Sequence, residues 1–306
     1  MKSRKNRHRG DYPHEIAVQE RLSAVHELRI RDVAGSAPEP EPHAREDSRP
    51  DAGTKSRIER KRAKRHLRDT CRNGYELANG RQEAAYERGE TDEFIKKNGG
   101  RTACRGYHGY PKCTCISPNH VICHGIPSAD KILKSGDIIN IDVTVIVDGW
   151  YGDTSRMYYI GKPKIKATRL CEVTYECLMR GIDAVKPGAH FGDIGAVIEE
   201  YAHKYGYSVV DMFCGHGLGK VFHDEPNVMH CGKKGTGPLI EEGMFFTIEP
   251  MINTGKKDGI ILSNGWTAVT RDKSLSAQFE HSLGVTKDGA EVFTYSLKGL
   301  DKPPYK

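Results

Sequence analysis

An alternation of apolar and polar side chains is the feature that most constrains how this chain can fold. In the run from Ile139 to Val147, apolar residues occupy every second position. Three polar residues lie between them: Asn140, Asp142 and Thr144. A period of two is typical of a β-strand with one apolar face. Asp148-Gly149 follows and is a strong signal for a two-residue turn. The sequence therefore predicts an antiparallel hairpin with strands at about 137–147 and 150–160.

The hairpin predicts the position of two carboxylates. With Asp148-Gly149 as the turn, Thr144 pairs with Asp153 and Asp142 with Ser155. Asp142 and Asp153 are then diagonal neighbours on one face, at about 7–8 Å between backbones, which is within side-chain reach of a common ion. A solvated polar face with two unrelated acids is the alternative interpretation, because antiparallel sheets often have one wet face.

A second pair of acids repeats the pattern later in the chain. Apolar alternation in 244–249 leaves Glu249 on the polar face, and alternation in 278–285 does the same for Glu280. Between these segments and the hairpin lies His216, flanked by Gly215 and Gly217. A buried carboxylate without a partner costs several kcal/mol or more, so four acids on apolar strands predict bound cations.

The donor set indicates which ions would bind. Four carboxylates balance two divalent metals, and oxygen ligands with one imidazole suit Mn, Fe, Co or Zn. Two further histidines in loops, His124 and His223, could donate hydrogen bonds to a polarised carbonyl or a tetrahedral intermediate. Each is a weak signal on its own, and an ordinary loop histidine is the alternative.

The basic character of the chain belongs to its N-terminal quarter. The net charge is +6 overall, with +7 in residues 1–75 and −1 in the remainder. Residues 1–57 are charged and proline-rich, which is typical of a disordered or loosely structured basic arm. Residues 58–90 form a divergent segment that could be helical. The arm is interpreted mainly as solvated, with a ribosome or RNA contact as the alternative.

From about residue 91 to 300 the composition is that of a globular domain. Residues 167–186 and 193–205 carry apolar side chains at helical spacing, and strands are expected at 208–213 besides those above. Helices mixed with hairpins predict an α+β fold. No apolar run is long enough to span a membrane, and nine scattered cysteines favour reduced thiols, so a cytoplasmic protein without membrane contact is expected.

Several segments together resemble the methionine aminopeptidases of the bacterial type 1 class, over about residues 91–294. The strings that carry the resemblance are Asn119-His-Val-Ile-Cys-His-Gly-Ile-Pro127, Gly136-Asp-Ile-Ile-Asn-Ile-Asp142, Gly152-Asp-Thr-Ser155, Cys214-Gly-His-Gly-Leu-Gly219, Phe245-Phe-Thr-Ile-Glu-Pro250 and Ser274-Leu-Ser-Ala-Gln-Phe-Glu-His281. The short gap between His216 and Glu249 leaves no room for the insertion of type 2 enzymes.

The resemblance implies a pita-bread fold, in which two pseudo-symmetric halves surround a curved antiparallel sheet with helices on its outer face. It implies co-translational removal of the N-terminal methionine when the second residue is small, by hydroxide generated at two divalent metals (Co, Mn, Fe or Zn). It also implies a monomer that acts on nascent polypeptides. The implied metal ligands are Asp142, Asp153, His216, Glu249 and Glu280.

Further roles are implied by motif position. His124, His223 and Glu249 are the implied catalytic residues, with Glu249 as the proton shuttle and both histidines also in contact with substrate. The implied methionine pocket consists of Cys104, Tyr107, Tyr110, Cys115, Phe222 and Trp266, since sulfur and aromatic rings suit a thioether.

The N-terminal region departs from the family pattern. Only Asp92 to Gly100 resembles the end of the family's second helix, so the preceding region is either a divergent extension or the result of a reading-frame error. Two other functions stay open: a pita-bread hydrolase of the aminopeptidase P or prolidase kind, and a non-enzymatic binding module. The complete ligand set and the pocket residues argue against both.

Overall fold

The computed structural model describes residues 90–128, 130–296 and 299–305. The expectations for the basic arm, for the segment 58–89 and for its helix lie outside these residues. The first described element is the helix α3 (Glu90–Lys97), which lies where the sequence predicts the end of a helix. No helix in the described part of the chain is long and apolar enough to cross a membrane.

The predicted hairpin forms the central feature of the fold. Its strands are β4 (Ile138–Val147) and β5 (Trp150–Tyr159), joined at Asp148-Gly149, and both turn residues have positive φ. Thr144 lies opposite Asp153 and Asp142 opposite Ser155, which confirms the predicted register. The apolar face of β4 packs against Ile95 of α3 in a buried cluster, so the acid-bearing face is turned to the other side.

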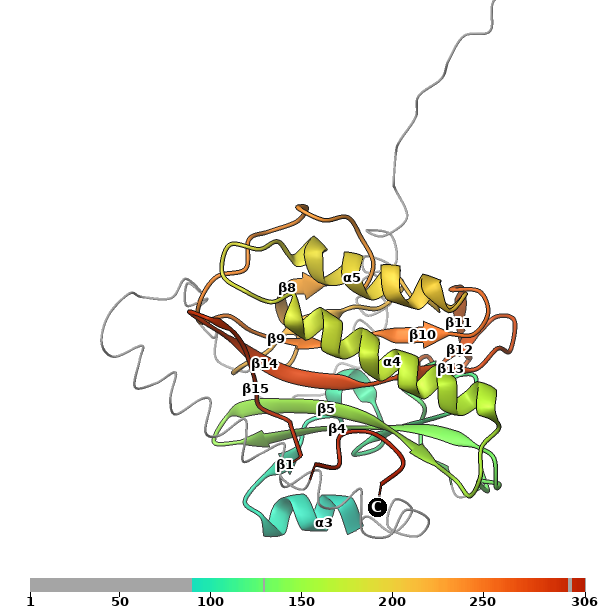
Figure 1. Cartoon of the computed structure of the whole chain (residues 1–306). Helices are drawn as coiled ribbons and strands as arrows, with labels where there is room; N and C mark the ends of the chain where they lie inside the picture. Colours follow the sequence, from blue (N-terminus) through green and yellow to red (C-terminus); the bar gives the residue numbers. More distant parts are fainter. Residues whose placement is uncertain (1–89, 129, 297–298, 306) are drawn as a thin grey trace, which may run out of the picture. The chain divides into compact units, whose positions relative to one another are not determined.

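The hairpin belongs to a nine-stranded sheet that is antiparallel throughout (Figure 1). Its main path runs in the order β1, β4, β5, β14, β9, β7, β8, while β2 pairs with β4 and β15 with β14. The remaining strands of this sheet are β1 (Arg101–Thr102), β2 (Cys115–Pro118), β7 (Gly215–Gly217), β8 (Asp224–Val228), β9 (Phe245–Ile248), β14 (Glu280–Thr286) and β15 (Gly289–Val292). A short 3₁₀ helix, Tyr107–Gly109, lies between β1 and β2.

Two small sheets complete the domain. One has the order β13, β10, β6 and the other β11, β12, β3. Their strands are β3 (Val121–Cys123), β6 (Ser208–Val209), β10 (Met251–Asn253), β11 (Gly259–Ile261), β12 (Ala268–Thr270) and β13 (Ser276–Gln278).

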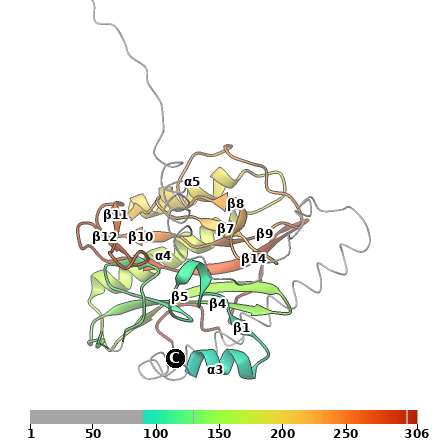
Figure 2. The same cartoon turned by 180° about the vertical axis from the view of Figure 1, so that it is seen from behind.

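Two long helices cover one face of the strands. α4 (Ile165–Asp183) and α5 (Phe191–Lys204) cross in front of them in Figure 1, whereas Figure 2 shows the strands from the opposite side. Their apolar faces meet the alternate side chains of β9 and β14, including Phe246, Ile248 and Leu283. Thr247 and Ser282 alternate with these residues, so the polar positions of both strands lie on the face away from the helices. The architecture is the expected pita-bread fold.

Some predicted boundaries were wrong. The strand expected at 278–285 is two strands, because the chain changes sheets at Phe279: Gln278 pairs with Met251 and Glu280 with Ser155. The strand expected at 208–213 ends at Val209, and the chain then turns toward β7. The two helices begin two residues earlier than expected and end one to three residues earlier.

Candidate metal centre

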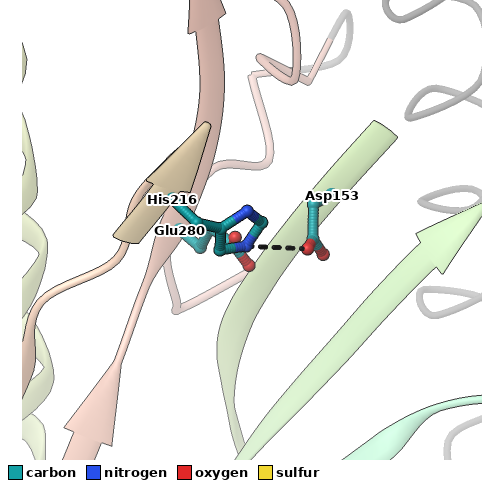
Figure 3. A group of neighbouring side chains, drawn as sticks. All are labelled: Asp153, His216 and Glu280. Carbon is teal, nitrogen blue, oxygen red and sulfur yellow. Dashed lines mark ion pairs between the residues drawn. The ribbon is translucent and has the colours of Figure 1, made fainter. Parts of the chain in front are cut away.

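Three buried side chains from strands that are distant in sequence converge at the centre of the sheet. They are Asp153 of β5, His216 of β7 and Glu280 of β14 (Figure 3). One potential ligand atom from each lies within 4.8 Å of the other two. Nε2 of His216 is 3.7 Å from Oδ2 of Asp153 and 3.6 Å from Oε1 of Glu249. The arrangement brings acids from both halves of the chain to one imidazole.

The imidazole of His216 is oriented by the backbone of the next residue, Gly217. Nδ1 lies 3.1 Å from the carbonyl oxygen of Gly217, to which it can donate, and this leaves the Nε2 lone pair directed at the acids. The flanking glycines permit the close packing that the sequence predicts. A Cβ on Gly215 would lie 2.4 Å from the carbonyl oxygen of Thr247, and one on Gly217 would lie 2.2 Å from that of Glu225.

Glu249 is held by three hydrogen bonds. Its carboxylate accepts from Oγ1 of Thr247 at 2.8 Å and from Nε2 of Gln278 at 3.0 Å. Its backbone N–H donates to Nε2 of His230 at 3.0 Å. Burial raises the pKa of Glu249 to about 7, against the opposing effect of His216. A carboxyl group near neutrality can both take up and release a proton at physiological pH.

Asp142 and Asp153 differ in how their oxygens are satisfied. Oγ1 of Thr144 donates to Oδ1 of Asp153 at 2.8 Å. Oδ1 of Asp142 is buried and has no hydrogen-bond partner among the described residues. Desolvation and the nearby charge of Asp153 raise the pKa of Asp142 well above its ordinary value. Burial opposes the charged form of His216, but a hydrogen bond to Asp153 and the charge of Glu249 outweigh it and raise the pKa.

The donor set fits divalent cations. Burial, and to a smaller extent the charges of neighbouring acids, raise the pKa values of Asp142 and Glu249, so the site disfavours this negative charge unless positive charge is present. The unpartnered oxygen of Asp142 and the free lone pair of His216 are the kinds of atom that coordinate such ions.

The two predicted loop histidines flank this centre. His124 has a φ of 55°, and the adjacent Gly125 has no room for a side chain, because a Cβ there would lie 2.0 Å from the carbonyl oxygen of Ile116. Burial lowers the pKa of His124 to about 4. The ring of His223 lies 4.2 Å from that of His216, centroid to centroid, and its Nδ1 is 2.7 Å from the hydroxyl of Tyr107. Desolvation and the charge of His216 lower the pKa of His223, so both rings are neutral near pH 7.

The structure brings the six predicted pocket residues into one apolar cluster. Cys104, Tyr110, Cys115 and Phe222 are buried in it, and Tyr107 and Trp266 pack against it. The prediction missed other members of this cluster, including Ile126, Ile146 and Tyr151, whose ring stacks on Phe222 at 5.3 Å. Tyr151 precedes Asp153 by two residues on β5, so strand alternation could have indicated it.

Sequence reasoning also missed the residues that donate or accept hydrogen bonds beside the predicted ligands. Thr144, Thr247 and Gln278 lie on the same polar strand faces as the acids, and that alternation was the available signal. His230 carried no such signal, because it follows β8 in a segment without regular patterning. Only the tertiary structure places its ring against the backbone of Glu249.

Comparisons with known proteins agree with this geometry. Residues 60–287 match metallopeptidase family M24. A methionine aminopeptidase of Rickettsia prowazekii is 60% identical over 213 residues, which are 69% of this chain and 82% of that protein. The crystal structure of methionine aminopeptidase from Rickettsia prowazekii has a TM-score of 0.74 at 50% identity, with 78% of this chain and 97% of that chain covered.

A more distant solved structure shares the fold alone. The prolidase from Pyrococcus furiosus has a TM-score of 0.60 at 24% identity. The match covers 76% of this chain and 64% of the prolidase chain. The similarity to the methionine aminopeptidases is therefore much greater in sequence and extends over nearly the whole of the solved relative. With the matched region covering most of the chain and a site suited to divalent metals, the chain belongs to metallopeptidase family M24, among the methionine aminopeptidases.

Proposed function

We propose that this protein removes the N-terminal methionine from newly made polypeptides whose second residue is small. The observation that carries the proposal is the convergence of Asp153, His216 and Glu280 beside the apolar cluster that contains two cysteine sulfurs and several aromatic rings. Similar proteins at 50–60% identity are named methionine aminopeptidases, which supports the same reaction here. Polypeptides with a free N-terminus are its substrates.

Five residues would hold two divalent ions: Asp142, Asp153, His216, Glu249 and Glu280. Their four carboxylates balance the charge of two such ions. Ions bound there would lower the pKa of a water and polarise the carbonyl of the first peptide bond. The ligand set accepts several ions, so metal availability would decide among Co, Mn, Fe and Zn.

Glu249 would move the proton. Its carboxylate lies 3.6 Å from Nε2 of His216 and would take a proton from water and return it to the leaving amine. The hydrogen bonds from Thr247 and Gln278 fix the carboxylate between these two events.

His124 and His223 would stabilise the negative charge that develops on the scissile amide. Each is neutral near pH 7, so each retains one N–H that can donate. Nδ1 of His223 lies 2.7 Å from the Tyr107 hydroxyl, and with that hydroxyl as the donor the proton of the ring is on Nε2. The buried cluster around Cys104, Tyr110 and Trp266 would receive the methionine side chain, since sulfur and aromatic edges contact a thioether favourably.

The experiment that tests this function compares two peptide classes. The protein, purified without added metal and analysed for its metal content, is assayed on a Met-Ala-Ser peptide and on Xaa-Pro peptides. Faster release of methionine from Met-Ala-Ser supports the proposal. Faster cleavage of Xaa-Pro peptides would instead assign the protein to the prolidase or aminopeptidase P activity.

A further inference from the structure

The strand β14 changes its neighbour at Ser282. β9 occupies one edge of β14, and the other edge is shared by β5 and β15. The ladder with β5 ends at the pair His281–Thr154, and the ladder with β15 begins at Leu283. Ser282 therefore lies between the two ladders. The residue of β5 at this point is Asp153, because the strands are antiparallel and Thr154 pairs with His281.

The hydroxyl group of Ser282 takes the place of a ladder pair with Asp153. Oγ of Ser282 accepts a hydrogen bond from the backbone N–H of Asp153 at 3.2 Å. It donates a hydrogen bond to the backbone carbonyl oxygen of the same residue at 2.6 Å. Both residues are buried, and a buried backbone group without a partner costs about as much as a lost hydrogen bond. One side chain thus fixes the backbone position from which the Asp153 carboxylate reaches the site.

Thr294, which follows β15, fixes Ser282 in turn. Its buried hydroxyl accepts a hydrogen bond from the backbone N–H of Ser282 at 3.3 Å and lies 2.6 Å from Nδ1 of His281. The backbone N–H of Phe293 donates to the carbonyl oxygen of Ser282 at 2.9 Å. The segment after β15 therefore supports β14 at the residue that bonds to Asp153.

Arg156 holds Thr294 against β5. Its Nη2 donates to the carbonyl oxygen of Thr294 at 2.8 Å, and its Nη1 donates to that of Leu300 at 2.6 Å. The carboxylate of Asp301 lies 3.3 Å from Nη2 and balances the charge of this buried guanidinium, which needs such a partner. Arg156 follows Asp153 by three residues in β5, so the contacts form a closed circuit. β5 holds the C-terminal segment, this segment holds β14, and β14 holds β5 at Asp153.

We propose that Ser282 and Thr294 are positioning residues for Asp153 in the proposed metal centre. Their hydroxyl groups act through the backbone, and a shift of that backbone moves the Asp153 carboxylate relative to His216, whose Nε2 is 3.7 Å away. Support from the residues around a metal ligand is typically worth about 10–100-fold in metal affinity. The inference rests on the proposed metal centre, since it assigns Asp153 as a ligand.

The test titrates the full-length protein, freed of bound metal, with Co²⁺, whose visible absorption depends on the arrangement of its ligands. Ser282→Ala and Thr294→Val should weaken Co²⁺ binding about 10–100-fold and lower kcat on Met-Ala-Ser. Thr294→Ser keeps the hydroxyl and should bind Co²⁺ as the unchanged protein does. Thr174→Val is the matched control, because it removes a buried hydroxyl that bonds to the carbonyl of Leu170 within α4, and it should leave Co²⁺ binding unchanged.

Amide hydrogen exchange of the metal-free protein gives a second readout, which does not depend on the metal. The N–H of Asp153 should exchange roughly fivefold faster in Ser282→Ala, as expected for the loss of one hydrogen bond, and the N–H of Ser282 should do so in Thr294→Val. Thr294→Ser and Thr174→Val should show neither change. If Ser282→Ala does not fold, the two Thr294 variants decide the question.

Three outcomes would contradict the inference in different ways. Unchanged Co²⁺ affinity together with faster exchange at Asp153 would overturn the positioning role, because the backbone contact would then have no effect on the metal. Equal losses of affinity in Thr294→Ser and Thr294→Val would show that the hydroxyl is not the group that matters. Absence of Co²⁺ binding by the unchanged protein would refute the proposed metal centre itself, and the exchange rates would still show whether Ser282 holds the backbone of Asp153.

Discussion

The two halves of the proposed metal centre are built by different kinds of contact. Asp142 and Asp153 come from one hairpin, in which ten consecutive residue pairs set their register. His216 and Glu280 lie on β7 and β14 of the C-terminal half, and Glu249 directly follows β9. These three strands are joined by single pairs or short ladders. Local pairing therefore positions the first two proposed ligands, whereas the other three depend on packing across the sheet. We expect the two halves to fail in different ways when they are changed.

Loss of a ligand should have the largest effect, and it should be equal in the two halves. Asp153→Asn and Glu280→Gln each remove one negative oxygen donor from the buried centre. Losing several kcal/mol of charge stabilisation corresponds to a loss of about 10³-fold or more in kcat/KM. Metal content and kcat/KM on Met-Ala-Ser check this prediction. Asp288→Asn, an exposed change in the β14–β15 turn, is the control and should behave as the unchanged protein. Near-normal turnover by either ligand variant would refute the assigned centre.

Replacement of a threonine that hydrogen-bonds to a proposed ligand should have a larger effect in the C-terminal half than in the hairpin. Thr247→Val removes the hydrogen bond to Glu249 and the acceptor for the backbone N–H of His216, whereas Thr144→Val removes one hydrogen bond to Asp153. Because support around a ligand is worth about 10–100-fold, we expect a loss near the upper value for Thr247→Val and near the lower value for Thr144→Val.

Metal titration with parallel kinetics measures this difference. Thr168→Val is the matched control, since its exposed hydroxyl bonds only the carbonyl of Ile165 in α4. Equal losses for the Thr144 and Thr247 variants would show that the hairpin is no more robust than the C-terminal half.

Glycine substitutions in the hairpin and in the C-terminal half should lower the stability of the protein by different amounts. Gly149→Ala strains a positive φ of 80° in the hairpin turn but meets no atom within 4 Å, which costs about 1–2 kcal/mol. Gly217→Ala places a Cβ 2.2 Å from the carbonyl oxygen of Glu225, so backbone must move, at a cost of about 1–3 kcal/mol or more.

Thermal unfolding of both variants tests the order. The Gly217 variant should have the lower Tm and should also lose activity, because His216 moves with its neighbour. The Gly149 variant should keep its activity, since the turn itself contains none of the five proposed ligands. A lower Tm for the Gly149 variant than for the Gly217 variant would contradict the prediction. It would show that a strained φ angle costs more stability than a close contact with backbone.

The smallest effect is expected outside the site, at the start of α5. Asp193 accepts hydrogen bonds from the backbone N–H groups of His190 and Gly235, both at 2.8 Å, and these hydrogen bonds lower its pKa. A lowered pKa in the folded state stabilises the protein above the unfolded value of about 3.9, and this contribution disappears as pH falls through the folded value.

Unfolding of Asp193→Ala and the unchanged protein as a function of pH measures this contribution. The difference in Tm should be small and constant from neutral pH down to about 5 and should shrink below about pH 4, where the unfolded-state carboxyl becomes protonated. Activity at neutral pH should be unaffected. A difference that grew as the pH was lowered would have the wrong sign for a hydrogen-bonded carboxylate.

Local pattern was sufficient for much of the centre. The alternation from Ile139 to Val147 and the Asp-Gly turn predict the hairpin and its register, because neighbouring residues alone decide both. The same period of two predicts the polar positions of Glu249 and Glu280, and the flanking glycines of His216 indicate a crowded backbone. The sheet change at Phe279 was not predictable in this way, because Gln278 and Glu280 alternate normally although they pair in different sheets.

Residue order decides which acids the chain carries and on which face of a strand they lie, since side-chain direction in a strand is a local property. Residue order along one strand does not decide that Asp153, His216 and Glu280 converge within 4.8 Å. Their convergence requires β5, β7 and β14 to be brought into one sheet by pairing and by the packing of α4 and α5. The hydrogen bond between the backbone of Glu249 and His230 likewise exists only after that packing. Residue order therefore defined the donors and their chemistry, while long-range packing decided their distances, their partners and their pKa values.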